Sequence, residues 1–166
     1  VISADIIQLS TYYDDLLVDI TSAGTLPLQL AKQTGNYASN VVISNNTMNE
    51  TIGSAIRTTH PSQCIISGNI IKDGQGPAAN MSLIGFNDSV ISSNIITGAF
   101  GRIDGEGIYL QGVGSKITGN LIKNTPDQAI RAIGCDSVSI DGNTCISCGT
   151  SSAKTLDIRF FNNGSI

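Results

Sequence analysis

The fold is decided by the stretch CIISGNII, residues 64–71, and by the copies of it along the chain. In this phrase an isoleucine stands three residues before an asparagine, and an apolar residue stands two residues after it. The asparagine recurs every 23 to 26 residues, at Asn46, Asn69, Asn94, Asn120 and Asn143. The isoleucine recurs with it, at Ile43, Ile66, Ile91, Ile117 and Ile140. A period of this length indicates one structural unit that is repeated and stacked.

Each unit contains three short apolar segments separated by turn residues. The first ends before the asparagine at Asn, Gly or Ser, residue types that tolerate a left-handed backbone at a corner. The second follows the asparagine, and the third comes after a segment of variable length. The third segments are residues 55–59, 80–84, 107–111, 129–133 and 157–161. We therefore expect an all-β chain, a right-handed parallel β-helix solenoid with three short strands per coil of about 22–28 residues and about six coils.

Stacking places equivalent residues of successive coils above one another. Each strand then pairs with its copy in the next coil, at roughly 4.8 Å per step. The isoleucine positions should face inward and build one continuous core. The asparagine side chains can donate hydrogen bonds from coil to coil, as polar ladders do in other stacked β-structures.

The N-terminal third follows the repeat less closely. Leu28 and Leu30 around Gln29 resemble a third strand, as do Ile7 and Leu9 of the preceding coil, and residues 16–20 lie between them. We expect a single β-helix domain over 1–166, with a degenerate part at 1–39 and regular coils at 40–166. The chain ends as another repeat begins, which suggests a fragment of a longer protein.

Composition argues against two classes of partner. Charged residues make up only 13% of the chain and the net charge is −4, whereas nucleic-acid binding needs a basic surface. No run of 18 apolar residues is present, so we expect no membrane-spanning helix. Nucleic acid and membrane are therefore not expected partners.

Cysteine and histidine give little support for a metal or redox centre. Cys64 and Cys145 occupy inward repeat positions, where they serve as small core residues. Cys145 and Cys148 form a lone CxxC without a second pair or a βαβ context, which favours a structural role. His60 is the only histidine and precedes Pro61 in a turn. We expect no metal and no cofactor.

Alternation along the third segments predicts one outward column. It consists of Arg57, Ser82, Tyr109, Arg131 and Arg159. Guanidinium groups suit carboxylate or sulfate groups, and an aromatic ring can stack on a sugar. We therefore predict that Arg57, Tyr109, Arg131 and Arg159 bind substrate. The alternative is that exposed strand positions simply take polar and aromatic residues.

Acidic residues gather in the variable segments beside this column. They are Asp73, Asp104, Glu106, Asp127 and Asp157. Glu106 and Asp127 occupy similar points of consecutive coils, so they are the predicted catalytic pair, with Asp104 as the reserve. Glycoside hydrolysis uses two carboxyl groups on either side of the scissile bond. The alternative is that these residues form turns and solvated charges.

The repeats resemble those of the pectate-lyase-like superfamily of right-handed parallel β-helices. The closest phrases are ISGNIIKDG (66–74), ISSNIITG (91–98), ITGNLIKN (117–124) and IDGNTCISCG (140–149). This resemblance implies binding or degradation of polysaccharide outside the cell. Within the superfamily the chain looks most like a bacteriophage tailspike or a secreted polysaccharide-active β-helix, which implies an extracellular or virion-surface location and a homotrimer.

Two functions follow from these observations. The first is a polysaccharide-binding and polysaccharide-degrading β-helix, a glycosidase or lyase of the tailspike type. The second is a non-catalytic carbohydrate-binding protein or structural shaft. The enzyme requires the paired carboxylates to face the outward column, whereas the shaft predicts that Glu106 and Asp127 point into bulk solvent.

Overall fold

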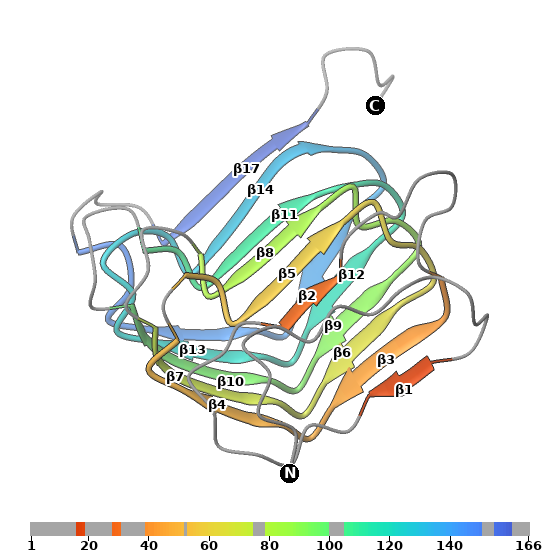
Figure 1. Cartoon of the computed structure of the whole chain (residues 1–166). Helices are drawn as coiled ribbons and strands as arrows, with labels where there is room; N and C mark the ends of the chain where they lie inside the picture. Colours follow the sequence, from red (N-terminus) through yellow and green to blue (C-terminus); the bar gives the residue numbers. More distant parts are fainter. Residues whose placement is uncertain are drawn as a thin grey trace, which may run out of the picture.

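The computed structural model describes residues 16–18, 28–30, 39–51, 53–74, 79–99, 105–150 and 155–160, and in these every regular element is a β-strand (Figure 1). The strands are β1 Leu16–Val18, β2 Leu28–Leu30, β3 Val41–Ser44, β4 Thr47–Asn49, β5 Ile56–Thr59, β6 Ile65–Ser67, β7 Ile70–Gly74, β8 Met81–Ile84, β9 Val90–Ser92, β10 Ile95–Ala99, β11 Ile108–Gln111, β12 Lys116–Thr118, β13 Leu121–Lys123, β14 Ile130–Cys135, β15 Ser139–Asp141, β16 Thr144–Ile146 and β17 Leu156–Phe160. The expected all-β fold is confirmed.

The strands form three parallel sheets that wrap around a common axis (Figure 1). The sheet orders are β1-β3-β6-β9-β12-β15, β4-β7-β10-β13-β16 and β2-β5-β8-β11-β14-β17. From β2 onward, every third strand along the chain is a neighbour in the same sheet, so each of these coils contributes one strand to each side. This is a parallel β-helix with three strands per coil, as the repeat predicted.

The described strands of the N-terminal part join the same sheets. Leu16 pairs with Val41, and Leu28 pairs with Ile56, which places β1 and β2 in the two six-stranded sheets. The third strand expected around Leu28 and Leu30 is therefore confirmed, and β1 lies within the stretch 16–20 that precedes it. The expectation for Ile7 and Leu9 lies outside the described residues.

One apolar core runs along the inside of the coils. The isoleucines that precede the ladder asparagines by three residues are at most 1% exposed in four coils, at Ile43, Ile66, Ile91 and Ile117. The equivalent Ile140, in the last described coil, is only partly buried and packs against this core. Because these side chains stack directly, their burial is shared between neighbouring coils, and it supplies the main driving force for folding.

The corners of the coil use left-handed backbone conformations. At the corner before the ladder asparagine, φ lies between 55° and 66° in Asn45, Gly68, Ser93, Gly119 and Gly142. The next corner uses Glu50, Asp73, Gly98, Asn124 and Ser147. Glycine and asparagine adopt this conformation at the least cost, which explains their abundance at these repeat positions.

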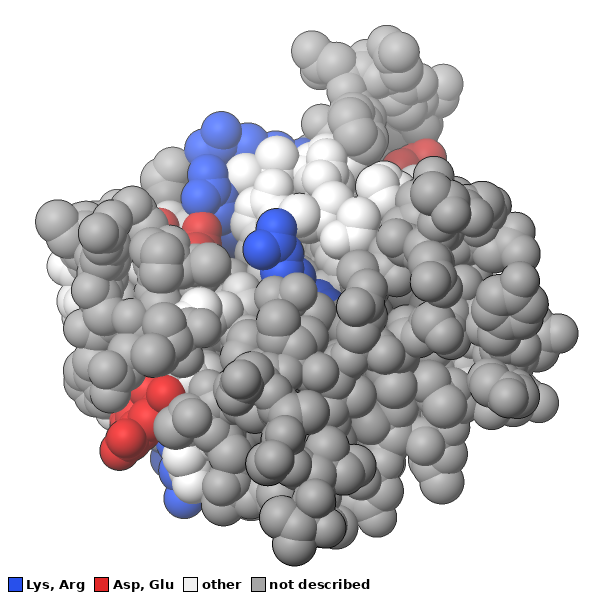
Figure 2. Space-filling model, viewed as in Figure 1, with Lys and Arg blue, Asp and Glu red and all other residues white. Residues whose placement is uncertain are grey.

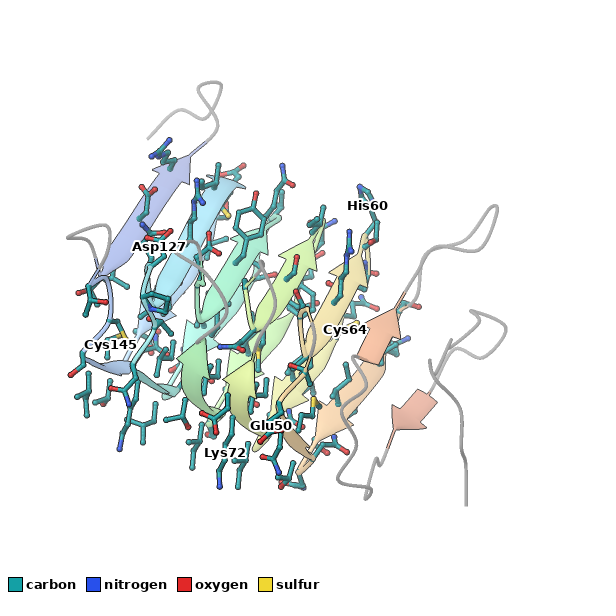
Figure 3. All side chains as sticks on the ribbon, turned by 60° about the vertical axis from the view of Figure 1, so that its left-hand side comes forward. Glu50, His60, Cys64, Lys72, Asp127 and Cys145 are labelled. Carbon is teal, nitrogen blue, oxygen red and sulfur yellow. The ribbon has the colours of Figure 1, made fainter. Side chains whose placement is uncertain are left out.

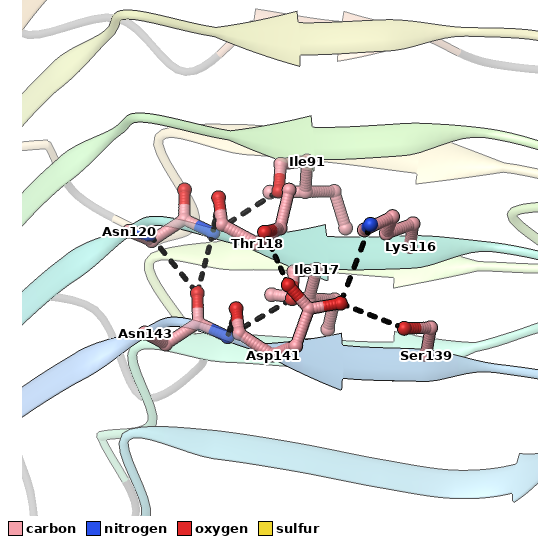
Figure 4. A network of polar contacts seen from close by, with 8 residues as sticks. All are labelled: Ile91, Lys116, Ile117, Thr118, Asn120, Ser139, Asp141 and Asn143. Carbon is pink, nitrogen blue, oxygen red and sulfur yellow. Dashed lines mark hydrogen bonds and ion pairs between the residues drawn. The ribbon is translucent and has the colours of Figure 1, made fainter.

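The asparagines form a continuous ladder inside the first of these corners. In successive coils the Nδ2 of one asparagine donates to the Oδ1 of the next, at 2.9–3.0 Å. The same Oδ1 also accepts a hydrogen bond from the backbone amide of the asparagine in the preceding coil. A further Nδ2 bond reaches the carbonyl of the inward isoleucine one coil earlier, as between Asn143 and Ile117 (Figure 4). The predicted ladder is confirmed, and it satisfies buried backbone groups that the sharp corner would otherwise leave unpaired.

A second polar ladder was not predicted. The amide of Cys64 donates to Ser89 Oγ at 2.8 Å, and the amide of Ser89 donates to Ser115 Oγ at 3.3 Å. All three residues are buried. The hydroxyl groups of Ser89 and Ser115 therefore complete the corner that precedes the first strand in two successive coils.

Within the part of the chain that the structure describes, no helix has the length and hydropathy needed to span a membrane.

Candidate functional site

Four residues of the predicted outward column lie side by side on the sheet that contains β5, β8, β11 and β14. Arg57 pairs with Ser82, Ser82 pairs with Tyr109, and Tyr109 pairs with Arg131. Basic side chains are visible on this face with acidic side chains beside them (Figure 2). Alternation along the strand was sufficient to find this column because residues on either side of it, such as Ile108 and Leu110, are fully buried.

The prediction was wrong for the fifth member of the column. In β17 it is Asp157 that pairs with Arg131, whereas Arg159 pairs with Ile133. Arg159 thus belongs to the next outward column, two residues further along the strand. A shift by two residues leaves the inward and outward faces unchanged, so the sequence pattern could not detect it.

Arg131 is the centre of the polar contacts on this face. Its Nη1 donates a hydrogen bond to Glu106 Oε1 at 2.8 Å, and its Nε lies 3.9 Å from Asp157 Oδ2. Its guanidinium carbon lies 6.0 Å from the centroid of the Tyr109 ring, at the outer limit of a cation–π contact. The hydrogen bond to Glu106 is the main factor that raises the pKa of Arg131. Arg131 is therefore a fully charged residue whose position is fixed by its neighbours.

The ion pairs continue into the last described coil. Arg159 Nε and Nη2 donate to the two carboxylate oxygens of Asp157 at 3.1 and 3.0 Å. Glu106, Arg131, Asp157 and Arg159 thus form a chain of alternating charges across three coils. Arg159, at 59% side-chain exposure, is the most exposed of the four.

Glu106 and Asp127 lie beside one another in consecutive coils. The amide of Asp127 donates to the carbonyl of Gly105, and the amide of Gly107 donates to that of Gln128. Glu106 is 6% exposed and Asp127 is 7% exposed. The structure thus brings the predicted pair together, and neither carboxylate points into bulk solvent.

Asp127 is held by hydrogen bonds to its backbone. Its carbonyl accepts hydrogen bonds from Thr125 Oγ1 at 3.0 Å and from the amide of Gly149 at 2.8 Å. Among the described residues, its buried Oδ1 has no hydrogen-bond partner. Buried polar atoms are nearly always paired, so an unpaired carboxylate oxygen next to an outward column of polar residues is a candidate for contact with a ligand.

Asp104, the reserve catalytic residue, lies outside the described residues. Two contributors to the site were missed by sequence reasoning, namely the pairing of Asp157 with Arg131 and the backbone support of Asp127 by Gly149. The second could not be recognised in the sequence, because Gly149 reads as an ordinary turn glycine.

One protein family matches the chain, and its description is "Periplasmic copper-binding protein (NosD)". The match extends over residues 33–163. No curated protein and no solved structure gives a significant match.

Proposed function

The chain belongs to the NosD family, and we propose that it is an envelope or extracellular β-helix that binds polysaccharide on the outer face of β5, β8, β11 and β14 and cleaves it beside Glu106 and Asp127. The word "periplasmic" in the family description supports the location. The contacts around Asp127 and Arg131 support the activity.

Binding is assigned to the column of Arg57, Ser82, Tyr109 and Arg131. Three steps of roughly 4.8 Å separate the first residue from the last, so the column extends for about 14 Å along the axis. Guanidinium groups with an aromatic ring between them can hold an acidic sugar chain by charge and stacking. Arg57 is exposed, and Tyr109 and Arg131 are half-buried, so each offers surface to a ligand.

The observation that carries the proposal is the presence of two buried carboxylates, in neighbouring coils and in different surroundings. Glu106 accepts a charge-assisted hydrogen bond from Arg131, which fixes the orientation of its carboxylate. Asp127 has a carboxylate oxygen that no described residue contacts by a hydrogen bond. We assign proton transfer with the glycosidic oxygen to Asp127, and we assign stabilisation of the positive charge at the anomeric carbon to Glu106.

Copper, which the family description names, does not fit the described residues. They contain no group of three or more His, Cys, Asp or Glu side chains that could hold a metal ion. Cys145 and Cys148 supply two sulfur donors, and His60 lies at the other end of the molecule from Cys145 (Figure 3). The proposed reaction therefore uses no step at a metal.

The test is incubation of the protein with a panel of bacterial capsular, O-antigen and uronate polysaccharides. New reducing ends indicate hydrolysis, and ultraviolet absorbance of an unsaturated product indicates elimination. Asp127→Asn and Glu106→Gln should each lower the rate at least about 100-fold, the usual contribution of a positioned acid or base. Asp141→Asn, an exposed carboxylate on another sheet, is the matched control. Cleavage that survives both site variants would refute the assignment.

A non-catalytic binding role or shaft is favoured by one observation. Arg131 contacts both Glu106 and Asp157, and such a network also occurs as a purely structural feature. This function predicts that Tyr109→Ala weakens polysaccharide binding while no product forms from any member of the panel. A phage-tail shaft would further be expected to sediment as a homotrimer.

A further inference from the structure

Cys145 and Cys148 share neighbours at the end of the apolar core. Cys148 Sγ lies 3.5 Å from the carbonyl oxygen of Ile122 and 3.4 Å from that of Ile146. Ile122 is the residue that pairs with Cys145 across the sheet, and Ile146 follows Cys145 in the chain. Both cysteines are half-buried and pack against the end of the core. The Cys148 sulfur therefore lies in the immediate surroundings of Cys145.

The backbone between them turns both side chains toward the interior. Ser147 adopts a left-handed conformation with φ of 53°, at the corner that Asn124 occupies one coil earlier. Cys148 thus takes the place of the buried Thr125, and Cys145 takes the place of the buried Ile122. Burial, and to a smaller extent the neighbouring Cys148, raises the pKa of the Cys145 thiol, which agrees with their proximity.

The same turn holds the backbone of Asp127. Gly149, directly after Cys148, donates its amide to the carbonyl of Asp127 at 2.8 Å and to that of Thr125 at 3.0 Å. Asp127 and Cys145 lie at the same end of the molecule (Figure 3). A covalent constraint on residues 145–148 would therefore act one residue away from the hydrogen bond that supports Asp127.

We propose that Cys145 and Cys148 form a reversible disulfide that fixes the turn supporting Asp127. The oxidant is a small-molecule disulfide such as oxidised glutathione. One cysteine thiolate attacks it, forms a mixed disulfide and releases one thiol. The second cysteine then attacks the protein sulfur of that mixed disulfide, and the second small-molecule thiol leaves. The net change is two protein thiols oxidised to one disulfide and one small disulfide reduced to two thiols.

The other two cysteines are internal controls. Cys64 is 2% exposed and Cys135 is fully buried. Cys64 Sγ donates to the carbonyl of Ser62, and Cys135 Sγ contacts the carbonyls of Leu110 and Ile133, so each has partners in its own part of the fold. Both are more deeply buried than Cys145 and Cys148, so a small-molecule disulfide reaches them less readily.

The experiment is oxidation of the full chain with oxidised glutathione, followed by alkylation in denaturant and peptide mass mapping. The expected result is the loss of two of the four alkylatable thiols, with one cross-link inside the peptide that contains residues 145–148. Cys64→Ser and Cys135→Ser should each still form the cross-link within residues 145–148. Cys145→Ser should abolish the cross-link and leave Cys148 as a mixed disulfide with glutathione. Four free thiols after oxidation, or a cross-link to Cys64 or Cys135, would overturn the pairing.

A second measurement tests the effect on the turn. Hydrogen exchange of the Gly149 amide should be slower in the oxidised than in the reduced protein, because the closed ring restricts local opening. Equal exchange rates with a proven disulfide would overturn the proposed support of Asp127. Neither measurement uses a polysaccharide, so the outcome is independent of the proposed function. The inference rests on that function only in giving Asp127 a catalytic role.

Discussion

Single residues in this protein act through contacts with the next coil. Asn94 shows this most clearly, because its Nδ2 donates to Ile66 and Asn120 and its Oδ1 accepts from the amide and side chain of Asn69. All of its hydrogen-bonding capacity is used at a site without exposure to solvent. A side chain that satisfies groups in two neighbouring coils couples them, and its loss leaves unpaired groups in both.

Asn94→Ala should lower the free energy of unfolding by about 3 kcal/mol, since it leaves several buried donors and acceptors unpaired at about 1–3 kcal/mol each. Urea unfolding followed by circular dichroism measures this change. Asn143→Ala is the control, because Asn143 is half-exposed and water can replace its bonds. We expect its effect to be about 1 kcal/mol. Equal effects of the two substitutions would contradict this role of the ladder.

Asp141 provides a prediction for how the stability of the fold changes at acidic pH. It accepts hydrogen bonds from Thr118 at 2.6 Å and Ser139 at 2.9 Å and pairs with Lys116 at 3.3 Å (Figure 4). These contacts, with the bond from Thr118 the largest, lower its pKa below the ordinary value of 3.8. Because the folded pKa is the lower one, the stabilisation is fully present above 3.8 and is lost as pH falls through the folded pKa.

Asp141→Asn should therefore reduce the urea midpoint slightly at neutral pH and leave it unchanged at a pH well below 3.8. The effect is small because this carboxylate is exposed to solvent. The measurement is the difference in midpoint between parent and variant across the acidic range. A difference in urea midpoint that grows as the pH falls would contradict this prediction.

At the scale of strands and corners, backbone spacing decides which residues are allowed. Gly112 follows β11, and a Cβ there would collide with the backbone of Phe86 in the coil below. Gly119 lies at a corner with φ of 64°, and a Cβ there would have nothing within 4 Å. Gly112 is thus required because two coils approach closely there, whereas Gly119 is required because its backbone conformation is left-handed.

Gly112→Ala should consequently be much more destabilising than Gly119→Ala. For Gly119→Ala we expect a loss of about 1 kcal/mol from left-handed strain alone. For Gly112→Ala the backbone of two coils must separate, so we expect about 3 kcal/mol or more, in the range of a severe packing defect. Thermal unfolding of the two variants gives the ranking, and the reverse order would refute the steric argument.

At the scale of the whole molecule, stability should vary along the axis. Ile71, Ile96 and Ile122 are completely buried between neighbouring coils, whereas Leu156 and Ile158 in β17 are 47% and 42% exposed. In a β-helix each coil contacts only the coils next to it. Local unfolding should therefore be easiest in the coil whose apolar side chains are least buried.

Hydrogen exchange read by mass spectrometry should therefore show slow exchange for β6–β13 and faster exchange for β15–β17. The comparison is made within one sample, so differences in solution conditions do not affect it. Uniform protection from β6 to β17 would contradict the prediction that stability falls toward β17.

The region expected to exchange faster, β15–β17, also contains Asp157 and the cysteine pair, and it borders Asp127. The candidate site thus lies where the stack is least constrained, which suits a surface that must accept a ligand. The proposed disulfide would strengthen this same region.

The repeat alone determined the parallel β-helix, its three strands per coil, the inward isoleucines and the asparagine ladder. Periodicity reveals these features because each buried position must be apolar or able to pair its polar groups in every coil. It also placed Arg57, Ser82, Tyr109 and Arg131 in one column, and it placed Glu106 and Asp127 at similar points of consecutive coils.

Only the tertiary structure decided the register of β17 and the surroundings of the two carboxylates. A shift of two residues preserves strand alternation, so the pattern fits Asp157 and Arg159 equally well above Arg131. The burial of Asp127 and its support by Gly149 depend on contacts between residues in different coils. Asp127 and Gly149 lie in the segments of variable length. These segments do not follow the repeat, so the sequence pattern does not predict their contacts.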